Sequence, residues 1–123
     1  MEESVEILRK GRCMRKVAAN YLLFPGWELT KNGYVEFLSS GEMRVVDMGG
    51  KIRDLAGLEF YGGMLVPDYV RDYVYLFHPG DELLPLLRRI LAERGKQFER
   101  IALIEGADLM RLVWTEKSVI RLF

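Results

Sequence analysis

The chain has 123 residues, of which half are apolar and 29% are charged, and its 18 basic and 18 acidic residues give a formal net charge of zero. This composition is that of a soluble globular domain, large enough to bury a core without disulfides. It excludes a membrane span, because no apolar run is long enough, and it argues against a protein that binds polyanions over its whole surface.

Residues 1–12 begin with acidic side chains and lack the apolar core of a secretory signal. Residues 2–10 have the apolar spacing of a short amphipathic helix, which needs a surface to lie on. The single cysteine, Cys13, excludes an intramolecular disulfide. We therefore expect a cytoplasmic protein.

A basic cluster covers residues 9–16. It consists of Arg9, Lys10, Arg12, Arg15 and Lys16. Because the whole chain is neutral, we interpret this cluster as a solvated end of the domain and expect no nucleic-acid partner. Weak binding of nucleic-acid phosphates by the cluster is the alternative.

The chain up to residue 66 alternates apolar runs with turn signals, at the spacing of antiparallel strands that follow one another. Pro25-Gly26 breaks the first run, and Asn32-Gly33 suits a tight turn with positive φ. A glycine pair, Gly62-Gly63, separates the last two runs. The predicted strands are 14–24, 34–38, 43–48, 58–61 and 64–66.

Residues 81–94 have the clearest helical pattern, with one apolar stripe of leucine and isoleucine and most charges off it. Asp81 is a candidate N-cap and Gly95 a candidate C-terminal stop. Pro85 is tolerated only in the first turn, so the helix begins at Asp81 or a residue or two later. The remaining strands are predicted at 101–105, 109–115 and 118–123.

Residues 58–78 contain the candidate ligand or interface residues. These are Tyr61, Tyr69, Tyr73, Tyr75 and His78, the only histidine of the chain. We expect an extended chain here, in which Tyr73, Tyr75 and Phe77 alternate onto one half-buried strand face. The alternative is a binding or self-association surface formed by the tyrosines.

No motif in the sequence indicates catalysis. The glycine pairs do not have the spacing of a phosphate-binding loop. The separation of Cys13 and His78 in the sequence matches no pattern of a catalytic dyad, and we interpret Cys13 as a buried structural residue. Asp68 and Asp72 would share a helical face, but the extended chain expected there makes them loop acids. We predict no catalytic residue, no metal ligand and no cofactor.

Several segments of the sequence resemble those of the metal-dependent amidohydrolases, the group of chlorohydrolase, cytosine deaminase and imidazolonepropionase relatives. VVDMGGKIRDLAG with LEFYGGMLVPDYV is similar to the segment before the catalytic barrel, and IALIEGADLMRL is similar to the strands after it. MRKVAANYLL and NGYVEF resemble the opening strands. In that family these strands meet in a small β domain, the composite domain, and the barrel is inserted between them.

The resemblance implies a composite domain that has lost its barrel. Where the family has its His-x-His metal motif, this sequence has Tyr73 and Tyr75. Residues 67–100 stand where a barrel would need roughly 250 residues. One histidine cannot supply the several imidazoles of such a metal site, so no metal ligand of the family carries over.

We therefore expect one mainly β domain over residues 1–123. Residues 14–66 and 101–122 would form a composite-type β-sandwich or pseudo-barrel, residues 1–12 an extension, and residues 67–100 a short connection that contains the helix 81–94. The expected function is non-catalytic and consists of self-association as a homo-oligomer or binding of a protein partner. The alternatives are a subunit of a split or degenerate hydrolase acting on C–N bonds and a weak nucleic-acid binder.

Overall fold

The structure is a computed structural model, and it describes residues 12–47 and 57–123. In this part of the chain seven strands form one mixed sheet in the order β4-β3-β1-β5-β6-β7, with β2 paired to β1. The strands are β1 (Cys13–Leu22), β2 (Thr30–Lys31), β3 (Gly33–Leu38), β4 (Met43–Asp47), β5 (Leu58–Pro67), β6 (Ile101–Glu105) and β7 (Val119–Leu122). A 3-10 helix, η1 (Asp68–Leu76), and an α-helix, α2 (Leu83–Arg94), lie between β5 and β6.

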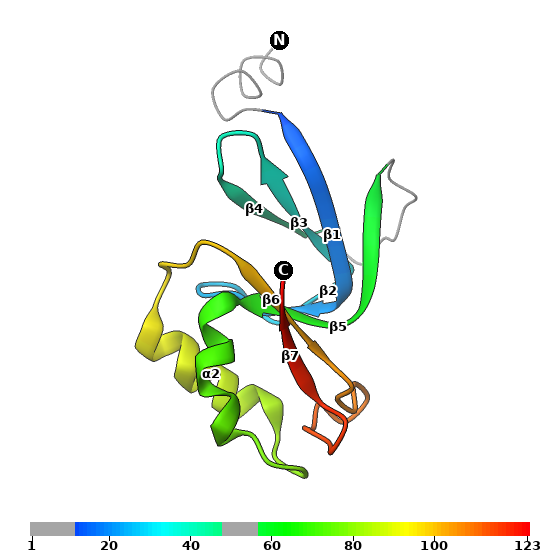
Figure 1. The fold of residues 1–123 in the computed structure, drawn as a ribbon, viewed down its shortest axis with the longest axis vertical. Helices are drawn as coiled ribbons and strands as arrows, with labels where there is room; N and C mark the ends of the chain where they lie inside the picture. Colours follow the sequence, from blue (N-terminus) through cyan, green and yellow to red (C-terminus); the bar gives the residue numbers. More distant parts are fainter. Residues whose placement is uncertain (1–11, 48–56) are drawn as a thin grey trace.

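The mainly β fold class with its inserted helix is confirmed, and strands from both chain ends share one sheet. β1, β3 and β4 form the predicted antiparallel meander. β5 joins this meander to the C-terminal strands, because it pairs in parallel with β1 and antiparallel with β6 (Figure 1). The sheet is not closed into a barrel, so β4 and β7 are its two ends.

β1 and β5 bend together at a single place. Their register shifts between Ala19 and Tyr21, opposite the glycine pair of β5. The N–H of Gly63 donates to Oδ1 of Asn20 at 2.8 Å, so this side chain supplies a hydrogen-bond partner where the regular ladder is interrupted. Figure 1 shows that the direction of both strands changes here, which folds the sheet over on itself.

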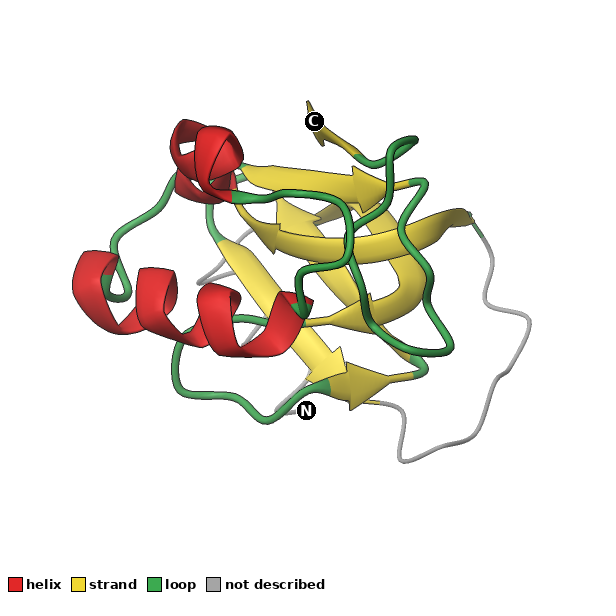
Figure 2. Ribbon diagram, turned by 90° about the horizontal axis from the view of Figure 1, so that it is seen from below, coloured by secondary structure: helices red, strands yellow, loops and turns green. Residues whose placement is uncertain are grey.

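The bend produces two hydrophobic cores. Between the two halves of the sheet, apolar side chains of β1 and β3 pack against those of β5 and β6; we call this side the inner face. Its buried residues are Val17, Ala19, Leu22, Phe24, Val35, Leu65, Ile101 and Leu103. On the opposite side, η1 and α2 cover the second half of the sheet, and α2 buries Leu83, Leu87, Ile90 and Leu91 there (Figure 2).

The segment after Pro67 is not the extended chain that the alternating aromatic residues predict. It forms the 3-10 helix η1, which buries Tyr69 and Val70. Tyr75 is 69% exposed whereas Phe77 is buried, so the two residues do not share a strand face. The prediction relied on the alternating aromatic residues alone. Apolar and aromatic residues also recur three apart in this segment, at Val70, Tyr73 and Leu76, which is the period of a 3-10 helix.

Two strand predictions are also wrong. The runs 58–61 and 64–66 belong to one strand, because the bulge carries β5 through its glycine pair without ending it. Within residues 109–115 no strand forms: residues 109–112 make a turn and Val113 makes only isolated bridges. The carboxylate of Asp108 accepts the N–H groups of Met110 and Arg111 at 3.1 Å. Leu112 follows with a left-handed φ of 54°.

The ends of α2 agree with prediction except at its N-cap. The helix begins at Leu83 with Pro85 in its first turn, and Gly95 stops it with a φ of 78°. Glu82 occupies the N-cap position in place of Asp81. The carboxylate of Asp81 instead accepts the backbone N–H of His78 at 2.9 Å, which stabilises the loop before the helix.

Neither helix in the described ranges has the length and apolar character that a membrane span requires. The short helix predicted at residues 2–10 lies outside the residues that the structure describes, and so does the basic pair Arg9 and Lys10.

We predict that Gly63→Ala strongly destabilises the fold. The φ of Gly63 is +140°, and a Cβ there would overlap the backbone carbonyl oxygen of Ile104. The substitution should lower the free energy of unfolding by about 3 kcal/mol or more, measured by urea denaturation. Gly41→Ala is the control: its φ is +91° but nothing surrounds it, so its cost should be about 1 kcal/mol. Equal losses in the two variants would contradict the role of close packing at Gly63.

Candidate functional site

The tyrosines and the histidine that the sequence singles out do not form one site. Tyr69 and Tyr73 lie on η1 under the guanidinium of Arg94, at 4.9 and 5.7 Å from their ring centres. The hydroxyl of Tyr69 donates to the carbonyl of Gly95 at 2.7 Å, and burial raises the pKa of Tyr69 to about 12. These two tyrosines therefore connect η1 to the end of α2.

The acids of η1 are also engaged in structural contacts. Asp72 forms an ion pair with Arg94 at 3.3 Å, and the carboxylate of Asp68 accepts the N–H of Arg100 at 3.2 Å. They lie on a helix and not on the extended loop that the sequence predicts. Their partners hold the helix against α2 and against the start of β6.

His78 lies in the loop before α2, with its side chain 72% exposed and Nδ1 3.5 Å from the carboxylate of Asp81. Cys13 is exposed at the start of β1 and not buried as predicted, because that end of the strand extends beyond the inner core. The pKa of its thiol is raised, first by partial desolvation and then by Glu36, so the thiol is protonated at neutral pH. In the described ranges no three His, Cys, Asp or Glu side chains lie close enough to hold a metal ion.

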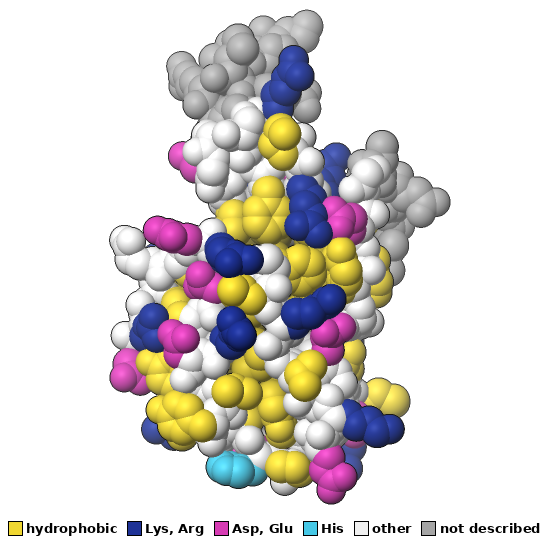
Figure 3. Space-filling model, in the orientation of Figure 1, with side chains coloured by type: hydrophobic (Ala, Val, Ile, Leu, Met, Phe, Trp, Pro, Cys, Tyr) yellow, Lys and Arg dark blue, Asp and Glu magenta, His cyan; other side chains and the backbone are white. Residues whose placement is uncertain are grey.

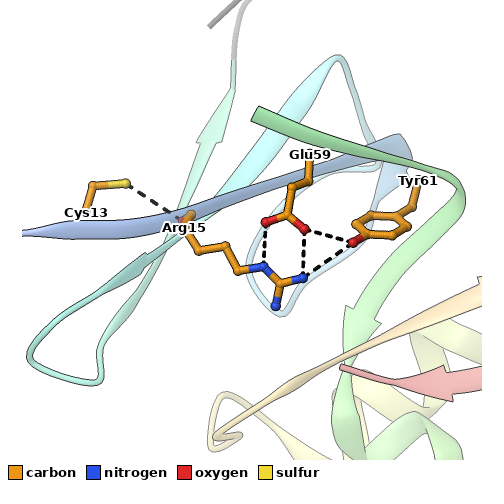
Figure 4. Close-up of polar contacts among 4 residues, drawn as sticks. All are labelled: Cys13, Arg15, Glu59 and Tyr61. Carbon is orange, nitrogen blue, oxygen red and sulfur yellow. Dashed lines mark hydrogen bonds and ion pairs between the residues drawn. The ribbon is translucent and has the colours of Figure 1, made fainter. Parts of the chain in front are cut away.

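Tyr61 belongs to a polar cluster on the inner face of the sheet (Figure 4). Arg15 donates from two nitrogens to both carboxylate oxygens of Glu59, at 2.6 and 2.8 Å, and the hydroxyl of Tyr61 donates to the same carboxylate at 2.8 Å. These hydrogen bonds lower the pKa of Glu59 to about 2 and raise that of Arg15. The ring of Phe123 packs edge-on against Tyr61 at 4.9 Å. The cluster links β1 to β5.

The charge of Arg15 is therefore neutralised locally and does not contribute to a basic patch. On the face shown in Figure 3, Lys and Arg side chains alternate with Asp and Glu, and apolar atoms are exposed between them. Such a mixed surface is typical of an ordinary soluble domain.

A groove of about 810 Å³ lies along β4, at one end of the sheet. One wall is formed by the five consecutive residues 41–45. Residues 41–42 belong to the hairpin turn and residues 43–45 to β4. Consecutive strand residues point to opposite faces, so a cavity that touches all three of the latter runs along the edge of the strand. In Figure 1 the connection from α2 to β6 passes below β4, and it forms part of the other wall.

Aromatic rings form the opposite wall of the groove. Phe24 is buried and stacks on Phe98 with ring centres 5.6 Å apart, while Trp27 is 44% exposed. A turn holds Trp27 in place: its N–H donates to the carbonyl of Phe24 at 3.1 Å, and Gly26 has a φ of 81°. Proline followed by a glycine with positive φ is the pattern of a type II turn. Pro25-Gly26 thus positions the exposed indole.

A second groove, of about 550 Å³, lies on the α2 side of the same turn. It shares Pro25, Trp27 and Lys96 with the first groove and adds Arg88 and Leu91 of α2. Trp27 therefore stands between two hollows. We call the groove along β4 the Trp27 groove.

The lining of the Trp27 groove mixes apolar and charged side chains. Aromatic and aliphatic residues line the groove together with four charged ones, and no histidine, cysteine or hydroxyl nucleophile lines it among the described residues. The sequence prediction treated Pro25-Gly26 only as a strand break and so missed this site. The available signal was a tryptophan directly after a turn, since an exposed tryptophan is a frequent anchor of protein interfaces.

Comparison with known proteins finds no match: no protein-family model matches the chain, and no curated protein or solved structure is significantly similar to it.

We predict that Glu59→Gln removes a pH-dependent part of the stability. Because the pKa of Glu59 is lowered to about 2 in the fold, its contribution is present above about pH 4.5 and is lost as the pH falls towards 2. The ion pair is more than one-third exposed, so the effect should be at most ~1 kcal/mol. In urea denaturation, the difference between wild type and variant should shrink over this pH range. Glu116→Gln, at a surface turn, is the control, and a difference that is constant with pH would contradict the prediction.

We predict that Trp27→Ala leaves the fold intact. Its free energy of unfolding should lie within about 1 kcal/mol of wild type, because the side chain is half exposed. Trp114→Ala should cost about 3–5 kcal/mol, because Trp114 is 6% exposed and stacks on Phe77. Thermal unfolding of both variants checks this. Comparable losses would mean that Trp27 supports the core and is not free to bind.

Proposed function

We propose that this chain is a non-catalytic binding module, which holds an extended segment of a protein partner in the Trp27 groove. The observation that carries the proposal is the position of a half-exposed tryptophan across a groove from a terminal strand of the sheet. The groove volume is in the range of ligand sites. A terminal strand offers backbone donors and acceptors, and the aromatic wall offers apolar contact.

A binding role is also in keeping with the sequence resemblance. A composite domain related to the amidohydrolases, but without a barrel, would have a surface to bury against a partner. The joining of strands from both chain ends in one sheet supports that relationship as part of the proposal. The two alternatives have less support among the described residues. A hydrolase could use only the exposed His78–Asp81 pair. A nucleic-acid binder would use a basic cluster in which Arg15 is already paired with Glu59.

The proposal is tested by selection from a displayed library of random peptides of about ten residues. Wild-type protein should enrich peptides that Trp27→Ala binds about tenfold or more weakly, as expected when an aromatic anchor is removed. Tyr75→Ala is the matched control, because Tyr75 is an exposed aromatic residue of η1 that does not line the groove. It should bind the same peptides with unchanged affinity.

Failure to enrich any peptide that depends on Trp27 would overturn the proposal. Light scattering provides a second measurement on the free protein. A dimer that dissociates in Trp27→Ala, but not in Tyr75→Ala, would identify a second copy of the chain as the occupant of the groove.

A further inference from the structure

We infer that the bound segment adds to the sheet as a strand antiparallel to β4, with apolar side chains at alternate positions and a net positive charge. This inference rests on the proposed function and specifies the occupant of the Trp27 groove. It follows from three features of the groove: the hydrogen-bonding direction of β4, the faces of its side chains, and the charges of its lining.

The backbone of β4 presents a regular set of groups at its outer edge. In the hairpin of β3 and β4, the N–H of Leu38 donates to the carbonyl of Glu42 at 2.9 Å. Hydrogen-bonded and non-bonded pairs alternate in an antiparallel ladder, and Glu36 pairs with Arg44 two residues further on. Arg44 therefore bonds to β3, and the N–H and C=O groups of Met43 and Val45 point outward. Within the described ranges β4 pairs with no strand on that side.

The side chains of the same two residues fix the face on which the partner lies. Met43 and Val45 pack against the core of the inner face, together with Phe98 of the opposite wall. In an antiparallel pair, residues directly opposite each other point to the same face. The segment residues opposite Met43 and Val45 therefore direct their side chains toward the aromatic wall that contains Trp27.

Backbone hydrogen bonding and side-chain contact involve the same positions of the segment. The residues whose side chains enter the groove are also those whose N–H groups bond to β4. A parallel strand would separate the two roles. Of the two residues that flank the one lying opposite, one would donate its N–H to β4 and the other would accept through its C=O. The antiparallel orientation is assigned because antiparallel pairing is slightly more stable per residue and continues the antiparallel pairing of β4 with β3.

The charges of the groove favour a basic segment. Arg44 forms an ion pair with Glu36 at 2.6 Å, so its charge is compensated. The other charged residues of the lining are Glu42, Glu99 and Lys96. None of the ion pairs among the described residues involves them. Two carboxylates and one ammonium leave a net negative charge. Lysine or arginine in the bound segment would complement it.

The experiment uses a synthetic copy of a peptide that the selection on wild-type protein enriches. Each residue is replaced in turn by alanine, and each backbone amide is methylated in turn, with affinity measured by the change in tryptophan fluorescence of the protein on binding. Both changes should weaken binding at the same alternate positions, by about tenfold where a bonded amide is lost. Methylation at the intervening positions should have little effect. Because the amide changes are made in the peptide, the fold of the protein is not at risk.

The charge of the groove is tested in the same assay with Glu42→Lys combined with Glu99→Lys. This variant should weaken binding of the peptide, and added salt should reduce the difference. Glu116→Lys together with Glu93→Lys is the control, because these residues do not line the groove.

The outcomes separate this inference from the proposed function. If no peptide depends on Trp27, the proposed function is wrong. If such peptides bind but tolerate methylation at every position, binding by strand addition is wrong. If the methyl-sensitive and alanine-sensitive positions alternate with each other, the antiparallel orientation is wrong. Enrichment of acidic peptides would overturn the assignment of a basic segment.

Discussion

The close passage of β5 beside β6 at Gly63 is the constraint on which the rest of the structure depends. A side chain at this position would occupy the space of the Ile104 carbonyl, and the backbone there has a φ that favours glycine. The bend at this point turns β1 and β5 together, and the hydrogen bond from Gly63 to Asn20 holds the two strands across the register shift. Folding of the sheet over itself creates the inner core and brings β4 opposite the connections that carry Trp27 and Phe98. The groove is therefore a consequence of the bend.

The Trp27 groove is assembled from three short segments that lie far apart in the sequence. Residues 24–27 supply the turn and its aromatic rings, residues 41–45 the strand edge, and residues 96–99 the remaining wall. Each segment is unremarkable alone: a proline-glycine turn, a hairpin strand, and the loop after a helix. Their proximity depends on the sheet topology, and no local pattern in the sequence reports it. The tyrosines are a contrasting case, since they are close in sequence but serve separate structural contacts with Arg94 and with Glu59.

Local signals in the sequence predicted the elements whose causes are local. The meander follows from turn residues such as Asn32, which has a φ of 59°, and α2 follows from its apolar stripe and its stop at Gly95. The predictions were wrong where one sequence pattern is compatible with two different local structures. The segment of η1 has aromatic residues that alternate, as in a strand, and also apolar residues three apart, as in a 3-10 helix. The glycine pair of β5 fits a break and a bulge equally well. The parallel pairing of β1 with β5 was not predicted, because it depends on burial of both strands in the finished sheet.

The parallel pair at the centre of the sheet has a consequence for the speed and order of folding. Lys16 pairs with Leu58, and Met64 pairs with Ile104, so the central ladders join residues about forty positions apart. Long-range pairing of this kind slows folding to the range of milliseconds to seconds, whereas a hairpin such as β3–β4 closes in roughly 1–10 μs. The β3–β4 hairpin can therefore form before the aromatic residues of the groove pack near it. Met43 and Val45 then lie at an uncovered strand edge. During synthesis that edge would be a site for chaperone capture or for aggregation between nascent chains.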